Sequence, residues 1–291
     1  MLIVSCSHGS HLGYSIAKKL KARHSELFVE KFPDDELLIR FNSDLKGQAV
    51  VLVQSFYKNI SDCIIEVVLA AQTARELGAK KIELVALYFP YLRQDKRFHK
   101  GESASQGIIA KLIGKYIDSV YIVDPHLHRR FSLGQIFKIS AKKITTNILI
   151  AEYIEKHLKN PVIIGPDEES YRWARNVAEM IGAESRILKK KRYSSYHVEV
   201  KLNKKIYLGN KNVVIVDDIV STGHTIIEAA KLLRKLGAKN IYCICVHGIF
   251  VDDALKKLKK EKIKVVSTNT ILNPVARIDI SGLVATELKN F

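Results

Sequence analysis

The sequence predicts an α/β protein with two similar domains, each a mainly parallel sheet flanked by helices. Short apolar runs rich in Val and Ile alternate with amphipathic stretches along the chain, which is typical of βαβ units with buried parallel strands. The chain has 291 residues, and at roughly 100–200 residues per domain this suggests about two domains. Its apolar fraction of 47% is ample for packed cores.

In the first half, apolar periodicity places most elements. The expected strands are Leu2–Cys6, Leu27–Phe32, Leu37–Phe41, Ala49–Val53, Ile82–Leu87 and Ser119–Val123, with helices between them. Helices are expected at Ser61–Leu77 and Ser105–Tyr116, where apolar residues recur at helical spacing. Gly78 follows the first of these helices as its C-cap.

The second half repeats the strand and helix rhythm without a self-similar segment of fixed period. The expected strands are Val162–Ile164, Ser185–Leu188, His197–Val200, Val213–Val216, Ile241–Val246, Val265–Ser267 and Arg277–Ile280. The expected helices are Thr145–His157, Glu169–Ile181, Thr225–Leu236, Asp252–Glu261 and Ser281–Lys289. We place the boundary between domains 1–144 and 145–291, although the last helix could pack on either domain.

Charge and cysteine content limit the functional classes. The chain carries 47 Lys and Arg against 30 Asp and Glu, a net charge of +17, which fits nucleic acid, an anionic small substrate or a lysine-rich solvated surface. None of its four cysteines forms a Cys-x-x-Cys pair, as expected for a reduced, cytoplasmic protein without a disulfide framework or zinc site. No segment approaches the roughly 18 apolar residues of a membrane span.

The most informative segment is Val213–Thr225, with the sequence VVIVDDIVSTGHT. Four apolar residues predict a buried parallel strand, and two aspartates stand at its carboxyl end, where ligands bind in open α/β sheets. The Ser-Thr-Gly turn leads into a helix, so its amide groups and hydroxyls can hold a phosphate. Asp217 and Asp218 accept hydrogen bonds from sugar hydroxyls. A bare Asp-Asp pair that only begins the next helix is the alternative.

This segment resembles the phosphoribosyl pyrophosphate loop shared by type I phosphoribosyltransferases and ribose-phosphate pyrophosphokinases. The resemblance implies two phosphoribosyltransferase-like domains and a ribose 5-phosphate site in domain 145–291. The implied residues are Asp217, Asp218, Ser221, Thr222, Gly223, His224 and Thr225. Ser221 occupies a position that many members fill with Asp, and Ser there is familiar from archaeal-type members.

Two further motifs resemble the ATP site of the pyrophosphokinases, which the transferases lack. Tyr91–Arg97 is similar to the Tyr-x-Arg-Gln-Asp-Lys signature, and Phe32–Glu36 is similar to the turn that holds adenine across a subunit boundary. The resemblance implies an ATP site on domain 1–144 and a homo-oligomer. Its residues are Phe32, Asp34, Glu36, Arg93, Gln94, Asp95 and His126. Without the resemblance, a phenylalanine such as Phe32 would more often be a core residue.

Magnesium contacts are implied at two positions. His126 in Asp124–His128 matches the family histidine near the magnesium of the nucleotide, and Asp167 matches the aspartate of a second magnesium near the ribose phosphate. Magnesium prefers oxygen ligands, so a lone histidine would by itself be a structural hydrogen-bonder. Glu168 and Glu169 depart from the family pattern and would repel an anionic substrate unless a metal intervenes; they also suit a helix N-terminus.

The basic run Lys189–Arg192 resembles the flexible catalytic loop, with Lys190 and Arg192 as catalytic residues and Lys189 and Lys191 as register alternatives. By itself such a run is usually a solvated or nucleic-acid-facing patch. The implied reaction transfers the diphosphoryl group of ATP to ribose 5-phosphate, with Mg²⁺ as cofactor, for nucleotide biosynthesis. The alternatives are a phosphoribosyltransferase, a catalytically silent regulatory relative, or a basic nucleic-acid binder.

The positive charge is concentrated near the implied site. Residues 184–211 hold nine Lys and Arg against two Asp and Glu, a net +7, and residues 90–101 hold four against one, a net +3. This distribution favours polyphosphate substrates, and we expect neither a nucleic acid nor a membrane partner.

Overall fold

The structure, a computed structural model, describes residues 1–127, 132–167, 170–192, 198–202 and 208–289. The chain forms two compact units. Unit 1 comprises Met1–Thr145 with Ile280–Phe291, and unit 2 comprises Thr146–Asp279. None of the helices in the described ranges is both long and apolar enough to cross a membrane.

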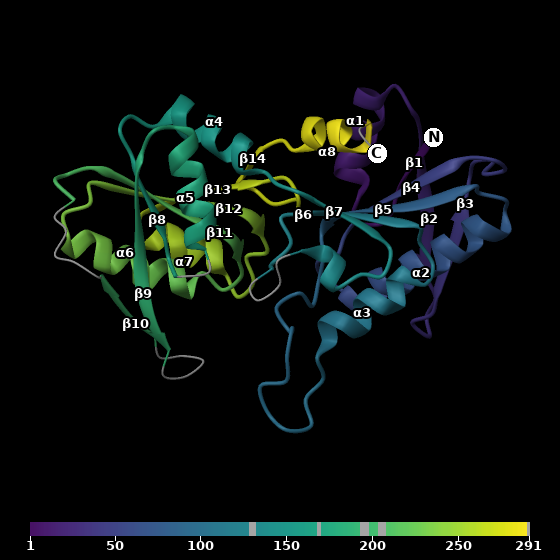
Figure 1. The fold of residues 1–291 in the computed structure, drawn as a ribbon, viewed down its shortest axis with the longest axis horizontal. Coiled ribbons are helices and arrows are strands. Elements are labelled where there is room, and N and C mark those ends of the chain that lie inside the picture. The colour runs from purple at the N-terminus through teal and green to yellow at the C-terminus, as the bar shows by residue number, and fades with distance from the viewer. Residues whose placement is uncertain (128–131, 168–169, 193–197, 203–207, 290–291) are drawn as a thin grey trace. The chain divides into compact units, whose positions relative to one another are not determined.

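Unit 1 is a seven-stranded sheet with helices on both faces (Figure 1). The strand order is β3-β2-β1-β4-β5-β6-β7, and every pair is parallel except β2 with β3. Helices α1 and α8 pack together on one face, and α2 and α3 cover the other. The strands are β1 (Leu2–Ser5), β2 (Arg23–Lys31), β3 (Leu37–Phe41), β4 (Ala49–Ser55), β5 (Lys81–Tyr88), β6 (Ser119–Val123) and β7 (Ser140–Ile144). The helices are α1 (Ser10–Leu20), α2 (Ile60–Glu76), α3 (Ser105–Gly114) and α8 (Ser281–Lys289).

Unit 2 has the same topology, with strand order β10-β9-β8-β11-β12-β13-β14 and one antiparallel pair, β9 with β10. Helices α4 and α5 contact each other on one face, and α6 and α7 do so on the other. The strands are β8 (Val162–Gly165), β9 (Glu184–Arg192), β10 (Val198–Leu202), β11 (Asn212–Val220), β12 (Asn240–Gly248), β13 (Ile263–Thr268) and β14 (Ala276–Ile278). The helices are α4 (Asn147–His157), α5 (Tyr171–Met180), α6 (His224–Lys235) and α7 (Ala254–Lys260).

Strand register relates the two units residue by residue. The first residue of β1 lies opposite Val50 of β4, and the first residue of β8 lies opposite Val213 of β11. Counting on from these pairs, Gln54 takes the position of Asp217, and Ser7 takes that of Asp167. The two halves, which share no repeat of fixed period in sequence, therefore share one architecture.

Residues 280–291 differ from the predicted division, which placed them with the second domain. Helix α8 packs on α1, and Ile280 and Val284 are fully buried. Lys142 and Glu287 form an ion pair of 2.9 Å within unit 1. Burial of its apolar face, which sequence alone could not assign to a partner, holds this helix on the first unit.

Two elements were not located from the sequence. Helix α1 carries polar residues and lies in a stretch to which we assigned no specific helix. Strand β7 has only Ala141 and Ile144 as apolar residues and lies at a sheet edge, where alternation is weak. The remaining expected strands and helices form, but β2 begins four residues earlier than predicted, and β9 and β11 each end four residues later.

Gly165 ends β8 and requires the absence of a side chain. A Cβ atom there would lie 2.7 Å from Cα of Tyr171, the first residue of α5. The helix thus approaches the strand end closely, and this contact places the loop that carries Asp167.

Replacing Gly165 by Ala should lower the free energy of unfolding by about 1–3 kcal/mol, because the methyl group must displace the α5 backbone. Thermal unfolding measures the change. Gly107, in α3, has nothing within 4 Å of a built Cβ, so Gly107→Ala is the matched control and should stabilise the protein by up to about 1 kcal/mol. Equal stability of G165A and wild type would contradict this packing argument.

Candidate active site

The predicted sugar-phosphate loop forms at the carboxyl end of β11, a central strand of unit 2. Val213–Val216 are fully buried, as the four-residue apolar run predicts. The strand continues through Asp217 and Asp218, which are only 8% and 5% exposed. Two adjacent carboxylates therefore lie inside the protein at the edge of the sheet where α/β proteins bind ligands.

The turn after β11 has the geometry of an anion site. Gly223 has φ of +73°, in the left-handed region, and α6 begins at the next residue. A Cβ atom on Gly223 would also lie 3.3 Å from Leu258, so both the backbone conformation and the limited space favour glycine at this position. The first amide groups of α6 have no partners within the helix and carry the positive end of its dipole. Thr222 and His224 are exposed beside them.

Asp217 is held by donors from two segments. Its Oδ1 accepts hydrogen bonds from the Ser170 hydroxyl at 2.6 Å and from the Asp218 amide at 3.0 Å. Burial raises the pKa of Asp217, and the negative charges of Asp218 and Asp167 raise it further. Oδ1 of Asp218 in turn accepts the Ile219 amide at 2.8 Å.

Asp167 reaches this group from the neighbouring strand. It follows β8, and its Oδ1 accepts the Ser170 amide and hydroxyl, both at 2.9 Å. The predicted sugar residue Asp217 and the predicted metal residue Asp167 are thus joined through Ser170. A serine hydroxyl has one proton, so Oγ of Ser170 can donate to only one of these two carboxylates at a time.

Ser170 is the site residue that sequence reasoning missed. The available signal was its place three residues after Asp167 at a helix start, which is also the pattern of an ordinary helix cap. Glu168 and Glu169, whose effect on the site was left open, lie outside the described residues.

Lys190 and Arg192 lie on a strand, which corrects their prediction as loop residues. Strand β9 runs on through Arg192 and pairs with β10, with Lys190 opposite Val200 and Arg192 opposite Val198. Antiparallel pairing with β10 extends the backbone beyond the apolar run that marked the strand. The structure describes the backbone of these residues and not their side chains.

In unit 1 the predicted adenine turn is the tip of the β2–β3 hairpin. The Phe32 amide donates to the Glu36 carbonyl at 2.8 Å, and Asp35 has φ of +73°. Phe32 is 42% exposed, and Asp34 and Glu36 are exposed as well. An exposed aromatic ring beside two acids is unlike the core position that Phe32 would ordinarily take.

The second predicted part of the ATP site follows β5 and β6, which are adjacent. Arg93 and Gln94 are exposed, and Asp95 is half-buried. Gln106 of α3 anchors this loop, because its side-chain amide donates to the Leu92 carbonyl at 3.0 Å. His126 is half-buried after β6.

The sheet brings these two parts of unit 1 only partly together. The loop with Arg93 and the segment with His126 leave adjacent strand ends. The Phe32 turn follows β2, and β1 and β4 lie between β2 and β5. Two strands therefore separate the Phe32 turn from the Arg93 loop within one chain.

The protein side chains available as ligands fit a magnesium ion that is bound mainly through substrate phosphates. In the described ranges, no group of three or more His, Cys, Asp or Glu side chains is arranged to hold a metal by itself. Mg²⁺ typically uses one or two protein carboxylates together with substrate phosphates. Asp167 offers an oxygen donor of this kind, whereas the nitrogen of His126 fits magnesium less well.

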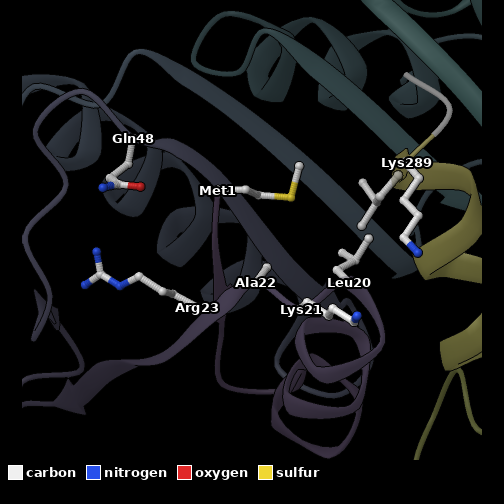
Figure 2. A pocket seen from close by; sticks show the side chains of 8 residues that line it. Met1, Leu20, Lys21, Ala22, Arg23, Gln48 and Lys289 are labelled. Atoms are coloured by element: carbon white, nitrogen blue, oxygen red, sulfur yellow. The ribbon is translucent and has the colours of Figure 1, made fainter.

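A cavity of about 540 Å³ lies at the opposite edge of the unit 1 sheet. It adjoins the start of β1 and β2, whereas the predicted ligand residues follow strand ends. Figure 2 shows that Arg23 and Gln48 line one side and Lys21 and Lys289 the other, with Met1 between them. None of the predicted site residues lines this cavity.

The fold and the loop define the class of protein: two α/β units of one topology, one of which carries two buried aspartates and a Ser-Thr-Gly turn at a strand end. Family models agree with this division. Residues 1–116 match the N-terminal domain of ribose phosphate pyrophosphokinase, and residues 132–281 match the phosphoribosyl transferase domain.

Full-length relatives identify the family. The ribose-phosphate pyrophosphokinase of Pyrococcus furiosus is 36% identical over 280 residues, which cover 96% of this chain and 97% of that protein. The enzyme of the same name from Methanothermobacter thermautotrophicus is 33% identical over 290 residues, covering 99% and 100%. The chain belongs to the ribose-phosphate pyrophosphokinase family, which confirms the family that the motifs predicted.

A solved structure supports the architecture. The crystal structure of phosphoribosylpyrophosphate synthetase from Mycobacterium smegmatis matches with a TM-score of 0.87 and 24% identity, covering 99% of this chain and 97% of that one. The predicted fold class, two mainly parallel sheets flanked by helices, is confirmed.

Replacing Asp217 by Asn should stabilise the folded protein, because it removes a buried carboxylate beside two other acids. We expect a thermal midpoint about 3 °C or more above wild type at neutral pH. The folded-state pKa is raised, so wild type loses stability as the pH rises from the unfolded value of about 4 toward the folded one. The gain should therefore be small at low pH and grow with pH.

The control for this measurement is Asp253, an exposed residue at the start of α7. An ion pair with Lys256 lowers the pKa of Asp253, so Asp253→Asn should not stabilise the protein at neutral pH. A D217N midpoint at or below wild type throughout the pH range would contradict the role of the buried charge.

Proposed function

We propose that the protein transfers the β,γ-diphosphoryl group of ATP to the anomeric hydroxyl of ribose 5-phosphate. The products are 5-phosphoribosyl 1-pyrophosphate, a precursor in nucleotide biosynthesis, and AMP. The anomeric hydroxyl oxygen attacks the β-phosphorus, the bond from that phosphorus to the α,β-bridging oxygen breaks so that AMP leaves, and the hydroxyl proton passes to solvent. One observation supports the proposal above all. The strand that carries the buried Asp217–Asp218 pair is followed by a turn in which Gly223 has a left-handed backbone conformation directly before α6.

Each part of unit 2 has a task in this reaction. The carboxylates of Asp217 and Asp218 accept the vicinal hydroxyls of the ribose, because ionised carboxylates are acceptors only. The phosphate of the sugar binds the α6 N-terminus, with hydroxyl donors from Ser221, Thr222 and Thr225. One loop can thereby hold both ends of the sugar phosphate.

ATP is proposed to bind unit 1. The exposed ring of Phe32 stacks on adenine, while Asp34 and Glu36 accept hydrogen bonds from its polar edge. Arg93, Gln94, Asp95 and His126 complete this site from the ends of β5 and β6. Because β1 and β4 separate these groups in one sheet, we infer a homo-oligomer in which two copies share the adenine site.

Mg²⁺ is the proposed cofactor, and Asp167 and His126 are the residues that would contact it. When bound, the ion neutralises charge on the phosphate oxygens. Lys190 and Arg192 are proposed to stabilise the charge that develops on the transferred group, as cations do in other phosphoryl transfers.

A phosphoribosyltransferase, which uses the product compound with a base, is the alternative. The match of residues 1–116 to the N-terminal domain of ribose phosphate pyrophosphokinase favours the proposed reaction. A cytoplasmic location is also proposed, since the four cysteines are free and buried.

Incubation of the purified protein with ATP, Mg²⁺ and ribose 5-phosphate tests the proposal directly. Formation of AMP and phosphoribosyl pyrophosphate in equal amounts is expected. Release of a base-linked nucleotide only when phosphoribosyl pyrophosphate and a free base are supplied would support the transferase instead. Salt-dependent binding of DNA or RNA without AMP formation would indicate a nucleic-acid binder.

Replacing Lys190 or Arg192 by Ala should reduce turnover by about two orders of magnitude or more, with smaller changes in KM, because their donors act mainly in the transition state. Steady-state AMP formation measures this. Lys256→Ala on α7 is the control and should leave turnover unchanged. Near-normal turnover in both variants would remove these residues from the mechanism.

Replacing Phe32 by Ala should raise the KM for ATP about tenfold or more, since base stacking on an aromatic ring is worth about 1–3 kcal/mol. The KM for ribose 5-phosphate should change little. Tyr14 on α1 is 61% exposed and provides the control Tyr14→Ala, which removes another exposed ring. An unchanged KM for ATP in F32A would exclude Phe32 from the adenine site.

A further inference from the structure

Ser170 connects two strands of unit 2 at the candidate sugar-phosphate site. The residue is only 4% exposed. Its Oγ lies 2.6 Å from Oδ1 of Asp217 and 2.9 Å from Oδ1 of Asp167. Asp217 lies on β11 and Asp167 follows β8, so one hydroxyl connects acids from two strands.

Helix capping explains only half of this arrangement. The amides of Ser170 and Tyr171 already bond to the Asp167 side chain and carbonyl, at 2.9 Å and 3.2 Å, which satisfies donors at the start of α5. The contact to Asp217 spans 47 residues of sequence and adds nothing to the helix start. It therefore needs another explanation.

The orientation of the Asp217 carboxylate supplies that explanation. The Ser170 hydroxyl and the Asp218 amide both reach Oδ1. Two donors on one oxygen restrict the rotation of the carboxylate. A carboxylate held in this way is preorganised, so binding a sugar hydroxyl costs less conformational entropy.

We propose that Ser170 is a positioning residue for the sugar substrate. It holds the Asp217 carboxylate in the orientation that accepts the ribose hydroxyls and ties it to Asp167. This inference rests on the proposed function, in which Asp217 binds ribose 5-phosphate. Ser170 itself does not touch the reacting atoms.

The test compares Ser170→Ala with Ser170→Thr, which keeps the hydroxyl. For S170A we expect the KM for ribose 5-phosphate to rise about tenfold, equivalent to about 1.4 kcal/mol, with the KM for ATP unchanged and kcat within about threefold. S170T should recover most of the loss. Calorimetric titration of each variant with ribose 5-phosphate gives the affinity independently of turnover.

Ser119 provides a matched control in unit 1. It is 2% exposed, and its hydroxyl donates to the Glu83 carboxylate at 2.8 Å, so Ser119→Ala removes the same kind of bond away from the sugar site. S119A and S170A should lose similar thermal stability, but only S170A should lose sugar affinity.

The outcomes separate the inference from the proposed function. Wild type that forms no AMP from ATP and ribose 5-phosphate would overturn the proposed function. Active wild type with an S170A variant that has unchanged sugar KM and affinity would overturn the inference alone, and Ser170 would then only cap α5.

Discussion

Burial of two adjacent carboxylates at the end of β11 is the constraint on which the rest of unit 2 depends. A buried carboxylate without donors is costly, and here Asp217 and Asp218 lie beside the thiol of Cys245. Burial raises the pKa of that thiol, and the two aspartates raise it further, so it remains neutral. The site is satisfied by Ser170, by backbone amides and, in the proposed function, by sugar hydroxyls.

The sequence predicted the fold wherever apolar runs were long. The four apolar residues before Asp217 located β11, and the Ser-Thr-Gly turn located the start of α6 within one residue. Strand β7, with two apolar residues, gave too weak a pattern. The place of residues 280–291 depends on the partner that buries α8, which no local pattern encodes.

The sequence predicted the individual acids of the candidate site but not the hydrogen bonds that connect them. Residues Asp167 and Asp217 stood out because each follows an apolar strand. The bond that joins them through Ser170 could not be foreseen, since it depends on the packing of α5 against Gly165. The extension of β9 through Lys190 and Arg192 was missed because pairing with β10, rather than hydrophobicity, forms it.

Unit 1 has the same strand topology but lacks acids at the two corresponding strand-end positions. At the positions of Asp167 and Asp217 it has Ser7 and Gln54, and the carboxylate that meets them comes from Glu66 of α2. Glu66 accepts hydrogen bonds from the Ser7 backbone amide at 2.7 Å, the Ser7 hydroxyl at 2.6 Å and the Gln54 side-chain amide at 3.1 Å. Burial raises its pKa, although these bonds oppose the shift.

The comparison shows how one fold carries two different arrangements of acids in one chain. In unit 1 the Glu66 carboxylate accepts the donors of Ser7 and Gln54 at the carboxyl ends of β1 and β4. In unit 2 the acids sit on the strand itself, and the turn after them keeps its amide donors at a helix start. Ser7, Gln54 and Glu66 thus form one hydrogen-bonded group in unit 1, whereas Asp217 in unit 2 bonds to Ser170 and to a backbone amide.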